Sequence, residues 1–299
     1  MLTSKQLQAL ADPIISIYND IELELISDLA SRFDVNETIG GTMEWRIQKL
    51  MQLGVFNADC VKTIANYSQK TEKEINDMLS KASLANFSEA ELMKASEAGL
   101  LVATLDQIKK SEDLMRVIKY SNADLSKTIS LINTKCLESV NQAYIDVINK
   151  AVVETSSGIR SYNESIVRAL KQYAKQGIDG ATYQRTDKNG NTKIVKYGLE
   201  GVLRRDIVTA CNSISNKASI EMAEEVGYGY VEVSAHLGAR VTKKLDYTNH
   251  AWWQGKVYKL EGSEPKYPNL AETTGLGKIE GLGGVNCRHR TFPFFPGVS

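Results

Sequence analysis

The sequence has 299 residues, of which 42% are apolar and 24% charged, and its 36 Lys and Arg balance 36 Asp and Glu. This composition is typical of a globular protein and excludes a wholly disordered or collagen-like chain. No run of about 18 apolar residues occurs, and the N-terminus lacks a basic stretch followed by an apolar one, so we expect neither a membrane span nor a secretory signal.

Charge and composition are distributed unevenly along the neutral chain. Residues 1–157 carry 16 basic and 22 acidic side chains, residues 158–225 carry 11 and 8, and residues 227–299 carry 9 and 6. All three His and four of the five Pro follow residue 226, and 17 of the 21 Gly follow residue 157. These shifts predict two regions with different surroundings, the first acidic and the second mildly basic.

Residues 1–157 have the pattern of successive helices. Asp12 and Pro13 suit the start of a helix, and apolar residues then recur at three- and four-residue intervals to about Phe33. A second helix is predicted from Thr42 to Gly54, and a long one from about 122 to 155. Capping boxes indicate further helix starts near residues 72 and 89; their residues are Thr71 with Glu74 and Ser88 with Glu91.

Residues 158–226 mix helix and hairpin signals. A capping box at Ser161 predicts a helix that Gly177 ends. Asn189-Gly190 is a strong hairpin signal between two strand-like runs, and an apolar stripe predicts a helix over 199–226.

Residues 227–299 are rich in Gly, Pro and aromatic side chains. Alternation from Tyr230 to Ser234 predicts a strand, and ten of the chain's 22 aromatic residues lie in this stretch. We therefore predict an α+β protein with three parts. They are an extended, mainly α-helical assembly region (1–157), a mixed helix and hairpin connecting region (158–226) and a β/loop C-terminal module (227–299).

The cysteines give no sign of a disulfide framework. There are four, at Cys60, Cys136, Cys211 and Cys287, and none forms a Cys-x-x-Cys pair. Four thiols in 299 residues are too few for a disulfide-rich scaffold, so we expect reduced thiols in a chain made in a cytoplasm.

The most informative residues form short motifs in the last region. These motifs are Ser234-Ala235-His236-Leu237-Gly238-Ala239-Arg240, Asn249 to Tyr258, Tyr267-Pro268, Thr274-Gly275-Leu276-Gly277, Gly281 to His289 and Pro293 to Ser299. The series resembles the C-terminal signature of the tailed-phage family known as phage minor capsid protein 2. It is more distantly similar to head morphogenesis proteins typified by protein F of phage Mu, which also end in an Asn-Cys-Arg type motif.

The resemblance implies a virion protein of the phage head, made in the host cytoplasm and associated with the portal or the capsid interior. It would act in head assembly by contacting other head proteins, the portal and the major capsid protein. The alternative is a virion-carried, toxin-like enzyme, a nuclease or transferase, because some Mu-type head proteins carry fused toxin enzymes. The motif residues that we expect to stabilise the module are His236, Arg240, His250, Trp253, Gly255, Asn286, Cys287, Arg288 and His289.

Four of these side chains are chemically suited to a metal. His236, His250, Cys287 and His289 offer the nitrogen and sulfur ligands of tetrahedral zinc, which would stabilise a small Gly-rich module. The Cys-x-His spacing is tighter than in common zinc motifs, and the other two histidines lie far upstream. In the alternative interpretation the module has no cofactor, these side chains form hydrogen bonds within turns, and Cys287 is a small buried apolar group.

A catalytic interpretation has less support. The two upstream histidines with Arg240 and Arg288 suit an acid/base pair beside an anion clamp. No Ser/His/Asp order, paired-carboxylate motif or phosphate loop accompanies them. The glycines between 275 and 284 follow no predicted strand and open no predicted helix, so they indicate tight turns and not a nucleotide site.

Basic residues in the last region suggest a further partner. Lys243-Lys244 and Arg288-His289-Arg290 suit occasional, non-specific and salt-sensitive contact with the phosphates of packaged DNA. The nearby Trp and Phe side chains are interpreted as core residues and not as base-stacking platforms.

Overall fold

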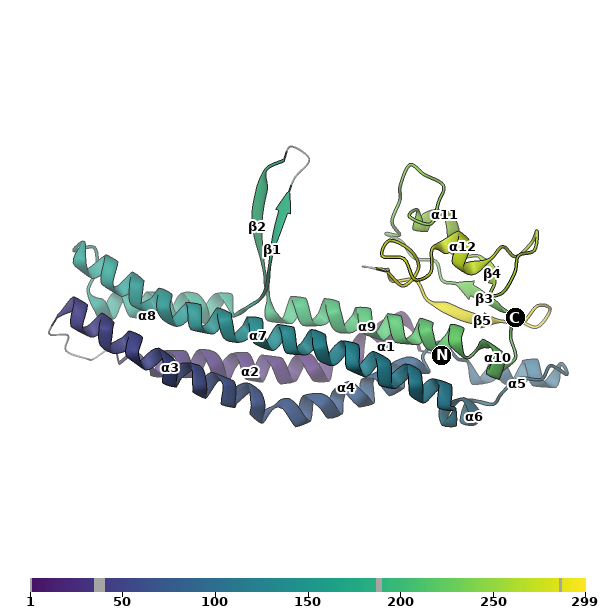
Figure 1. Cartoon of the computed structure of the whole chain (residues 1–299), viewed down its shortest axis with the longest axis horizontal. Coiled ribbons are helices and arrows are strands. Elements are labelled where there is room, and N and C mark those ends of the chain that lie inside the picture. Colours follow the sequence, from purple (N-terminus) through teal and green to yellow (C-terminus); the bar gives the residue numbers. More distant parts are fainter. Residues whose placement is uncertain (1, 35–40, 187–189, 285–286) are drawn as a thin grey trace. The chain divides into compact units, whose positions relative to one another are not determined.

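The computed structural model describes residues 2–34, 41–186, 190–284 and 287–299, and Figure 1 shows its elements. The helices are α1 (Ser4–Ala9), α2 (Asp12–Ser31), α3 (Thr42–Asn66), α4 (Ser68–Ser83), α5 (Glu89–Glu97), α6 (Leu105–Lys110), α7 (Glu112–Ser156), α8 (Tyr162–Gln176), α9 (Leu199–Glu221), α10 (Ala223–Val226), α11 (His250–Trp253) and α12 (Leu270–Thr274). The strands are β1 (Asp179–Thr186), β2 (Thr192–Gly198), β3 (Tyr230–Val233), β4 (Val257–Lys259) and β5 (Thr291–Phe294). The predicted α+β class, with a helical N-terminal region and small strands in the C-terminal part, is confirmed.

The chain forms two compact units, and each combines segments that are distant in sequence. Unit 1 consists of Met1–Asp12, Ile75–Leu125 and Asp206–Ser299. Unit 2 consists of Pro13–Glu74 and Ser126–Arg205. The functional division at residues 157 and 226 stays a prediction.

The core of unit 2 is built on the apolar stripe predicted for α2. Its buried residues include Ile17, Ile21, Leu25 and Leu29. Tyr144 of α7 is fully buried beside two other rings, 4.8 Å from Phe56 and 5.1 Å from Phe33 between ring centroids. Its hydroxyl donates to the carbonyl of Lys49 at 2.8 Å. This bond satisfies the polar tip of an otherwise apolar side chain.

Unit 2 also contains the predicted hairpin, in which β1 and β2 pair antiparallel. Gly190 adopts the left-handed φ of +84° that such a turn requires, and Asn189 lies outside the described residues. Most side chains of both strands are exposed. Figure 1 shows the ribbon projecting away from α8 and from the C-terminal half of α7.

Unit 1 contains a three-stranded antiparallel sheet with the order β4-β3-β5. The strand predicted near residues 230–234 is confirmed as β3. Val231 and Val233 are buried while Glu232 is exposed, as the alternation of a half-buried strand requires.

Helix α3 ends later than the sequence predicts. The prediction ends this helix at Gly54, but it continues to Asn66. A glycine inside a helix costs about 1 kcal/mol relative to Ala. The next turns bury Phe56 and Cys60 completely, and burial of one large apolar side chain contributes about 1.5–3 kcal/mol. The free energy gained by burying these side chains therefore outweighs the tendency of Gly54 to end the helix.

Of the three predicted capping boxes, the one at Ser161 forms with both of its reciprocal bonds, whereas Ser88 forms the side-chain half of its box. Ser88 caps α5 and Ser161 caps α8, each by accepting the backbone N–H three residues later. The capping box predicted at Thr71 is wrong, because its hydroxyl donates to the carbonyl of Tyr67 at 2.9 Å within α4. Helix α7 begins at residue 112, earlier than predicted.

No helix in the described part of the chain is long and apolar enough to cross a membrane.

The four cysteines are buried and free, as the reduced thiols predicted from the sequence require.

Gly227 allows a direct test of close backbone packing in unit 1. It follows α10 with a φ of +84°, and a Cβ atom there would lie 2.0 Å from the carbonyl oxygen of Leu101. Gly238 has the same φ but no atom within 4 Å of its Cβ position. Left-handed strain costs about 1–2 kcal/mol in either alanine variant. We expect Gly227→Ala to lower the free energy of unfolding by a further 1–3 kcal/mol or so.

Urea denaturation followed by circular dichroism measures both variants. Equal losses in Gly227→Ala and Gly238→Ala would contradict a close contact between Gly227 and Leu101.

Candidate functional site in the C-terminal segment

Three segments of the C-terminal part converge at the end of β3. Because β5 pairs antiparallel with β3, the residues after Val233 lie beside the residues before Thr291. The N–H of Ser234 donates to the carbonyl of Arg290 at 2.8 Å. The N–H of Gly255, just after α11, donates to the carbonyl of Val233 at 2.9 Å. The pairing of three distant segments therefore brings the predicted motif residues together.

His289 lies at the centre of this site and is 1% exposed. Its ring centroid lies 4.2 Å from that of His236, 4.7 Å from that of Trp253 and 5.3 Å from that of His250. Its Nδ1 lies 3.5 Å from the Sγ of Cys287. The predicted quartet of His236, His250, Cys287 and His289 is thus gathered in one place.

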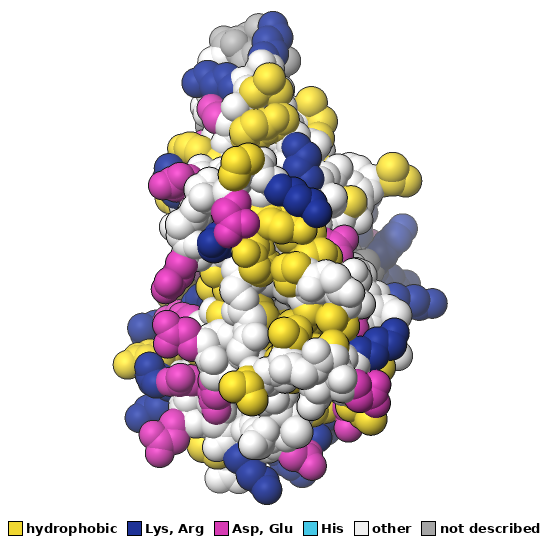
Figure 2. All heavy atoms as spheres, turned by 90° about the vertical axis from the view of Figure 1, so that its right-hand side faces the viewer, with side chains coloured by type: hydrophobic (Ala, Val, Ile, Leu, Met, Phe, Trp, Pro, Cys, Tyr) yellow, Lys and Arg dark blue, Asp and Glu magenta, His cyan; other side chains and the backbone are white. Residues whose placement is uncertain are grey.

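Burial controls the charge of these side chains. It lowers the pKa of His289 to about 3, with smaller contributions from the two neighbouring imidazoles. Burial likewise lowers the pKa of His250 and raises that of the Cys287 thiol. At neutral pH these two imidazoles and the thiol are therefore uncharged. In line with this burial, no His side chain is visible on the face of the molecule shown in Figure 2, where Lys and Arg are interspersed with Asp and Glu.

Other predicted residues fix the turns around the cluster. The carbonyl of Glu280 accepts from Arg240 Nη1 at 3.0 Å and from His250 Nε2 at 2.8 Å. The indole of Trp253 is fully buried and donates to the carbonyl of Tyr247 at 3.0 Å. These bonds satisfy backbone carbonyls in a segment with little regular structure.

The remaining predicted residues take different positions. Gly255 adopts a φ of +66°, and a Cβ atom there would lie 3.2 Å from that of Ala235. Arg288 is half-buried and donates to the hydroxyl of Thr209 on α9 at 3.1 Å. Asn286 lies outside the described residues.

A buried polar network was not predicted from the sequence. Asn216 of α9 accepts from the N–H of Thr291 at 2.9 Å and from the Nδ2 of Asn86 at 3.2 Å, and it donates to the carbonyl of His289 at 2.9 Å. Arg290, which the sequence suggested as a DNA contact, is 3% exposed and donates to Asn86 Oδ1 at 2.9 Å. Burial removes Arg290 from that role. The DNA interpretation now rests on the exposed Lys243-Lys244 pair.

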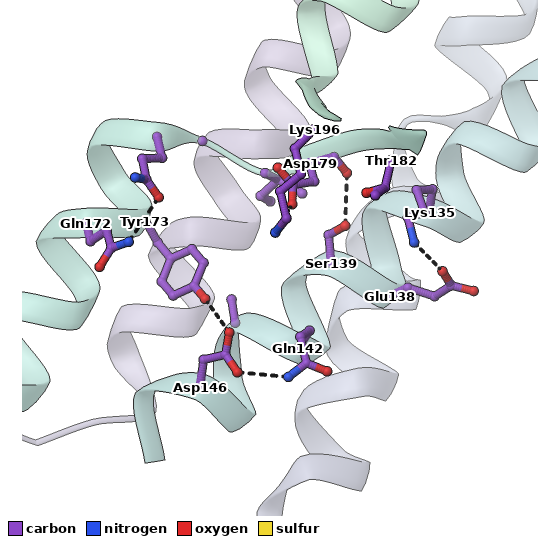
Figure 3. Close-up of a pocket in the computed structure, with 14 residues that line it drawn as sticks. Lys135, Glu138, Ser139, Gln142, Asp146, Gln172, Tyr173, Asp179, Thr182 and Lys196 are labelled. Carbon is purple, nitrogen blue, oxygen red and sulfur yellow. Dashed lines mark hydrogen bonds and ion pairs between the residues drawn. The ribbon is translucent and has the colours of Figure 1, made fainter. Parts of the chain in front are cut away.

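Unit 2 contains a cleft of about 660 Å³ between α7, α8 and the base of the hairpin. Figure 3 shows its polar lining, in which Asp146 accepts from Tyr173 and Gln142, both at 2.8 Å. Lys196 pairs with Asp179 at 2.8 Å, and the other charged lining residues, Lys135 and Glu138, pair at 3.0 Å. Each charged lining residue thus has an ion-pair or hydrogen-bond partner within the cleft, which we interpret as a structural feature.

Comparison with known proteins identifies the family. The sequence profile of the family described as phage minor capsid protein 2 matches residues 2–299. The chain belongs to the phage minor capsid protein 2 family. The family match extends well beyond residues 229–299, the part in which the motifs resemble the family signature. Membership places this minor capsid protein among the structural components of phage particles.

A curated relative agrees with this assignment. The chain is similar to a protein named structural protein from Lactococcus phage LL-H, with 23% identity over 270 residues that cover 86% of this chain and 67% of that protein. No solved structure matches the minor capsid protein.

The polar network around Asn216 predicts that removal of this one side-chain amide lowers the free energy of unfolding substantially. Asn216→Ala leaves the N–H of Thr291 and the carbonyl of His289 buried without their partner, and each unsatisfied group costs about 1–3 kcal/mol. We expect the free energy of unfolding to fall by about 3 kcal/mol. Asn76→Ala is a matched control, because Asn76 is an exposed helical asparagine that accepts from Asn122.

Chemical denaturation compares the two variants. The control is expected to change stability by less than about 0.5 kcal/mol. A similar small change in Asn216→Ala would show that the network does not stabilise unit 1.

Proposed function

We propose that this minor capsid protein acts in phage head assembly by binding other head proteins at the portal or the capsid interior. Its role is then protein–protein association. The helical region over residues 1–157 would supply the assembly contacts, residues 158–226 would connect, and residues 227–299 would anchor the protein. Synthesis in the host cytoplasm and occasional contact with packaged DNA belong to the same proposal.

An exposed apolar stripe on α3 carries this proposal. Successive helix residues are about 100° apart, so positions spaced by four lie along one face. Four such residues on α3 are exposed, and they are Met43 (62%), Ile47 (52%), Met51 (78%) and Val55 (59%). The opposite face of the helix is buried, and it includes Trp45, Phe56 and Cys60.

Helix α3 thus has two apolar faces, and unit 2 covers one of them. Scattered exposed apolar side chains are ordinary, but a contiguous apolar stripe is typical of a protein interaction site. Methionine suits such a surface because its flexible thioether adapts to a partner. In a head protein, another head protein is the natural partner for this stripe.

Charged substitutions test the α3 stripe. The double variant Ile47→Lys/Met51→Lys removes two apolar side chains from the proposed interface. Burial of each is worth about 1.5–3 kcal/mol, so binding is expected to weaken at least about tenfold. We expect the amount of variant protein in purified heads to fall, as measured by quantitative mass spectrometry after complementation of a phage that lacks the gene.

The control carries the same added charge elsewhere in unit 2. Leu131 and Val153 on α7 are 72% and 63% exposed but lie far apart along the helix. Leu131→Lys/Val153→Lys is expected to enter heads normally, and both variants are expected to keep the parental melting temperature. Normal incorporation of the α3 variant would refute the proposed interface. Crosslinking in purified heads then distinguishes the portal from the major capsid protein as the partner.

A further inference from the structure

The side chains of His250, Cys287 and His289, here called the His-Cys-His cluster, have the geometry of a metal site. One potential ligand atom from each lies within 4.8 Å of the others, and all three residues are buried. Cys287 Sγ and His289 Nδ1 are 3.5 Å apart. Zinc–sulfur and zinc–nitrogen bonds of about 2.3 and 2.0 Å in a tetrahedral site place sulfur and nitrogen ligands about 3.5 Å apart.

Hydrogen bonds hold both imidazoles of the cluster in the form that binds metal. The Oε1 of Gln254 accepts from the backbone N–H of His236 at 3.0 Å, and it also lies 3.0 Å from His289 Nε2. That ring nitrogen therefore carries the proton, which makes Nδ1 the acceptor of the Cys287 thiol and, once that thiol is deprotonated, a potential metal ligand. The carbonyl of Glu280, 2.8 Å from His250 Nε2, likewise places the proton of His250 on Nε2. Metal-binding histidines commonly donate their second nitrogen to an oxygen in this way.

His236 lies beside the cluster, and because its ring nitrogens are not within 4.8 Å of all three ligand atoms, its side chain would have to shift to supply a fourth ligand. Its ring lies 4.2 Å from the ring of His289, and its Nδ1 is 3.0 Å from the carbonyl of Leu237. Its Nε2 is buried and has no hydrogen-bond partner. A buried ring nitrogen without a partner costs free energy and requires an explanation. A metal ion bound by the neighbouring side chains supplies one.

We propose that the His-Cys-His cluster binds a structural zinc ion and that His236 supplies the fourth ligand. Three imidazole nitrogens and one thiolate match zinc, whereas magnesium and calcium require oxygen ligands. The Cys287 thiol loses its proton to solvent as its sulfur binds the metal. The ion would crosslink three segments: the loop after β3, α11 and the residues before β5.

Metal content and one buried thiol test the proposal. We expect the full-length protein, purified without chelators, to contain one zinc ion per chain by mass spectrometry of the metal. Cys287→Ser is expected to lose more than nine-tenths of this zinc. Cys211→Ser is the matched control, because Cys211 is also a buried free thiol of unit 1, and it is expected to keep the full zinc content.

Cobalt provides a readout that does not depend on a variant that folds. Replacement of zinc by Co²⁺ in the parental protein and in Cys211→Ser is expected to give the thiolate-to-cobalt absorption of a tetrahedral site. Removal of zinc by a chelator is expected to lower the melting temperature by more than about 5 °C. Folded parental protein with almost no zinc and no thiolate–cobalt absorption would overturn the proposal and leave a hydrogen-bonded cluster of aromatic rings.

Discussion

Burial of the Arg290 guanidinium is the constraint on which much of unit 1 depends. This group is 3% exposed and donates to the carbonyls of Leu2 and Ala85 and to the amide oxygen of Asn86. Its acceptors are neutral, and burial lowers the pKa of Arg290 to about 10, so it stays charged at neutral pH. A buried charge is tolerated only when its hydrogen bonds are satisfied. The N-terminal segment, the turn between α4 and α5, and β5 must therefore assemble together.

The segment that carries Arg290 connects two other parts of the fold. On one side Thr291 is held by Asn216 of α9, and on the other His289 and Cys287 face the loop after β3 and helix α11. Strand β5 has only four residues, so its backbone ladder is short. The side-chain contacts of the residues just before β5 therefore do much to fix the register of β5 against β3.

Local signals in the sequence predicted much of this protein, because helix caps, apolar stripes and hairpin turns depend on residues close in the chain. At Ser161 the side chain caps the start of α8. At Gly190 the absence of a side chain allows the left-handed φ of the turn. Gly54 shows the limit, since burial of residues in later turns keeps α3 helical. The residue types in the sequence could suggest a histidine cluster. Whether these side chains lie close together depends on how the strands pair, which the sequence does not show locally. The role of Arg290 could not be predicted, because its acceptors lie more than 200 residues away.

The β1–β2 hairpin has a consequence for the chain before it joins a particle. Each strand leaves an outer edge with unpaired backbone groups, and Tyr183, Ile194 and Tyr197 are 42%, 61% and 41% exposed. Such a ribbon is a template for edge-to-edge pairing, which charged side chains counteract. Arg185 of β1 and Lys193 of β2 are exposed cations that lie directly opposite each other, and charged side chains on an exposed strand disfavour pairing with another chain. The two cations thus place like charge on both strands of a ribbon whose side chains are mostly exposed, which opposes its pairing with a second copy of the chain.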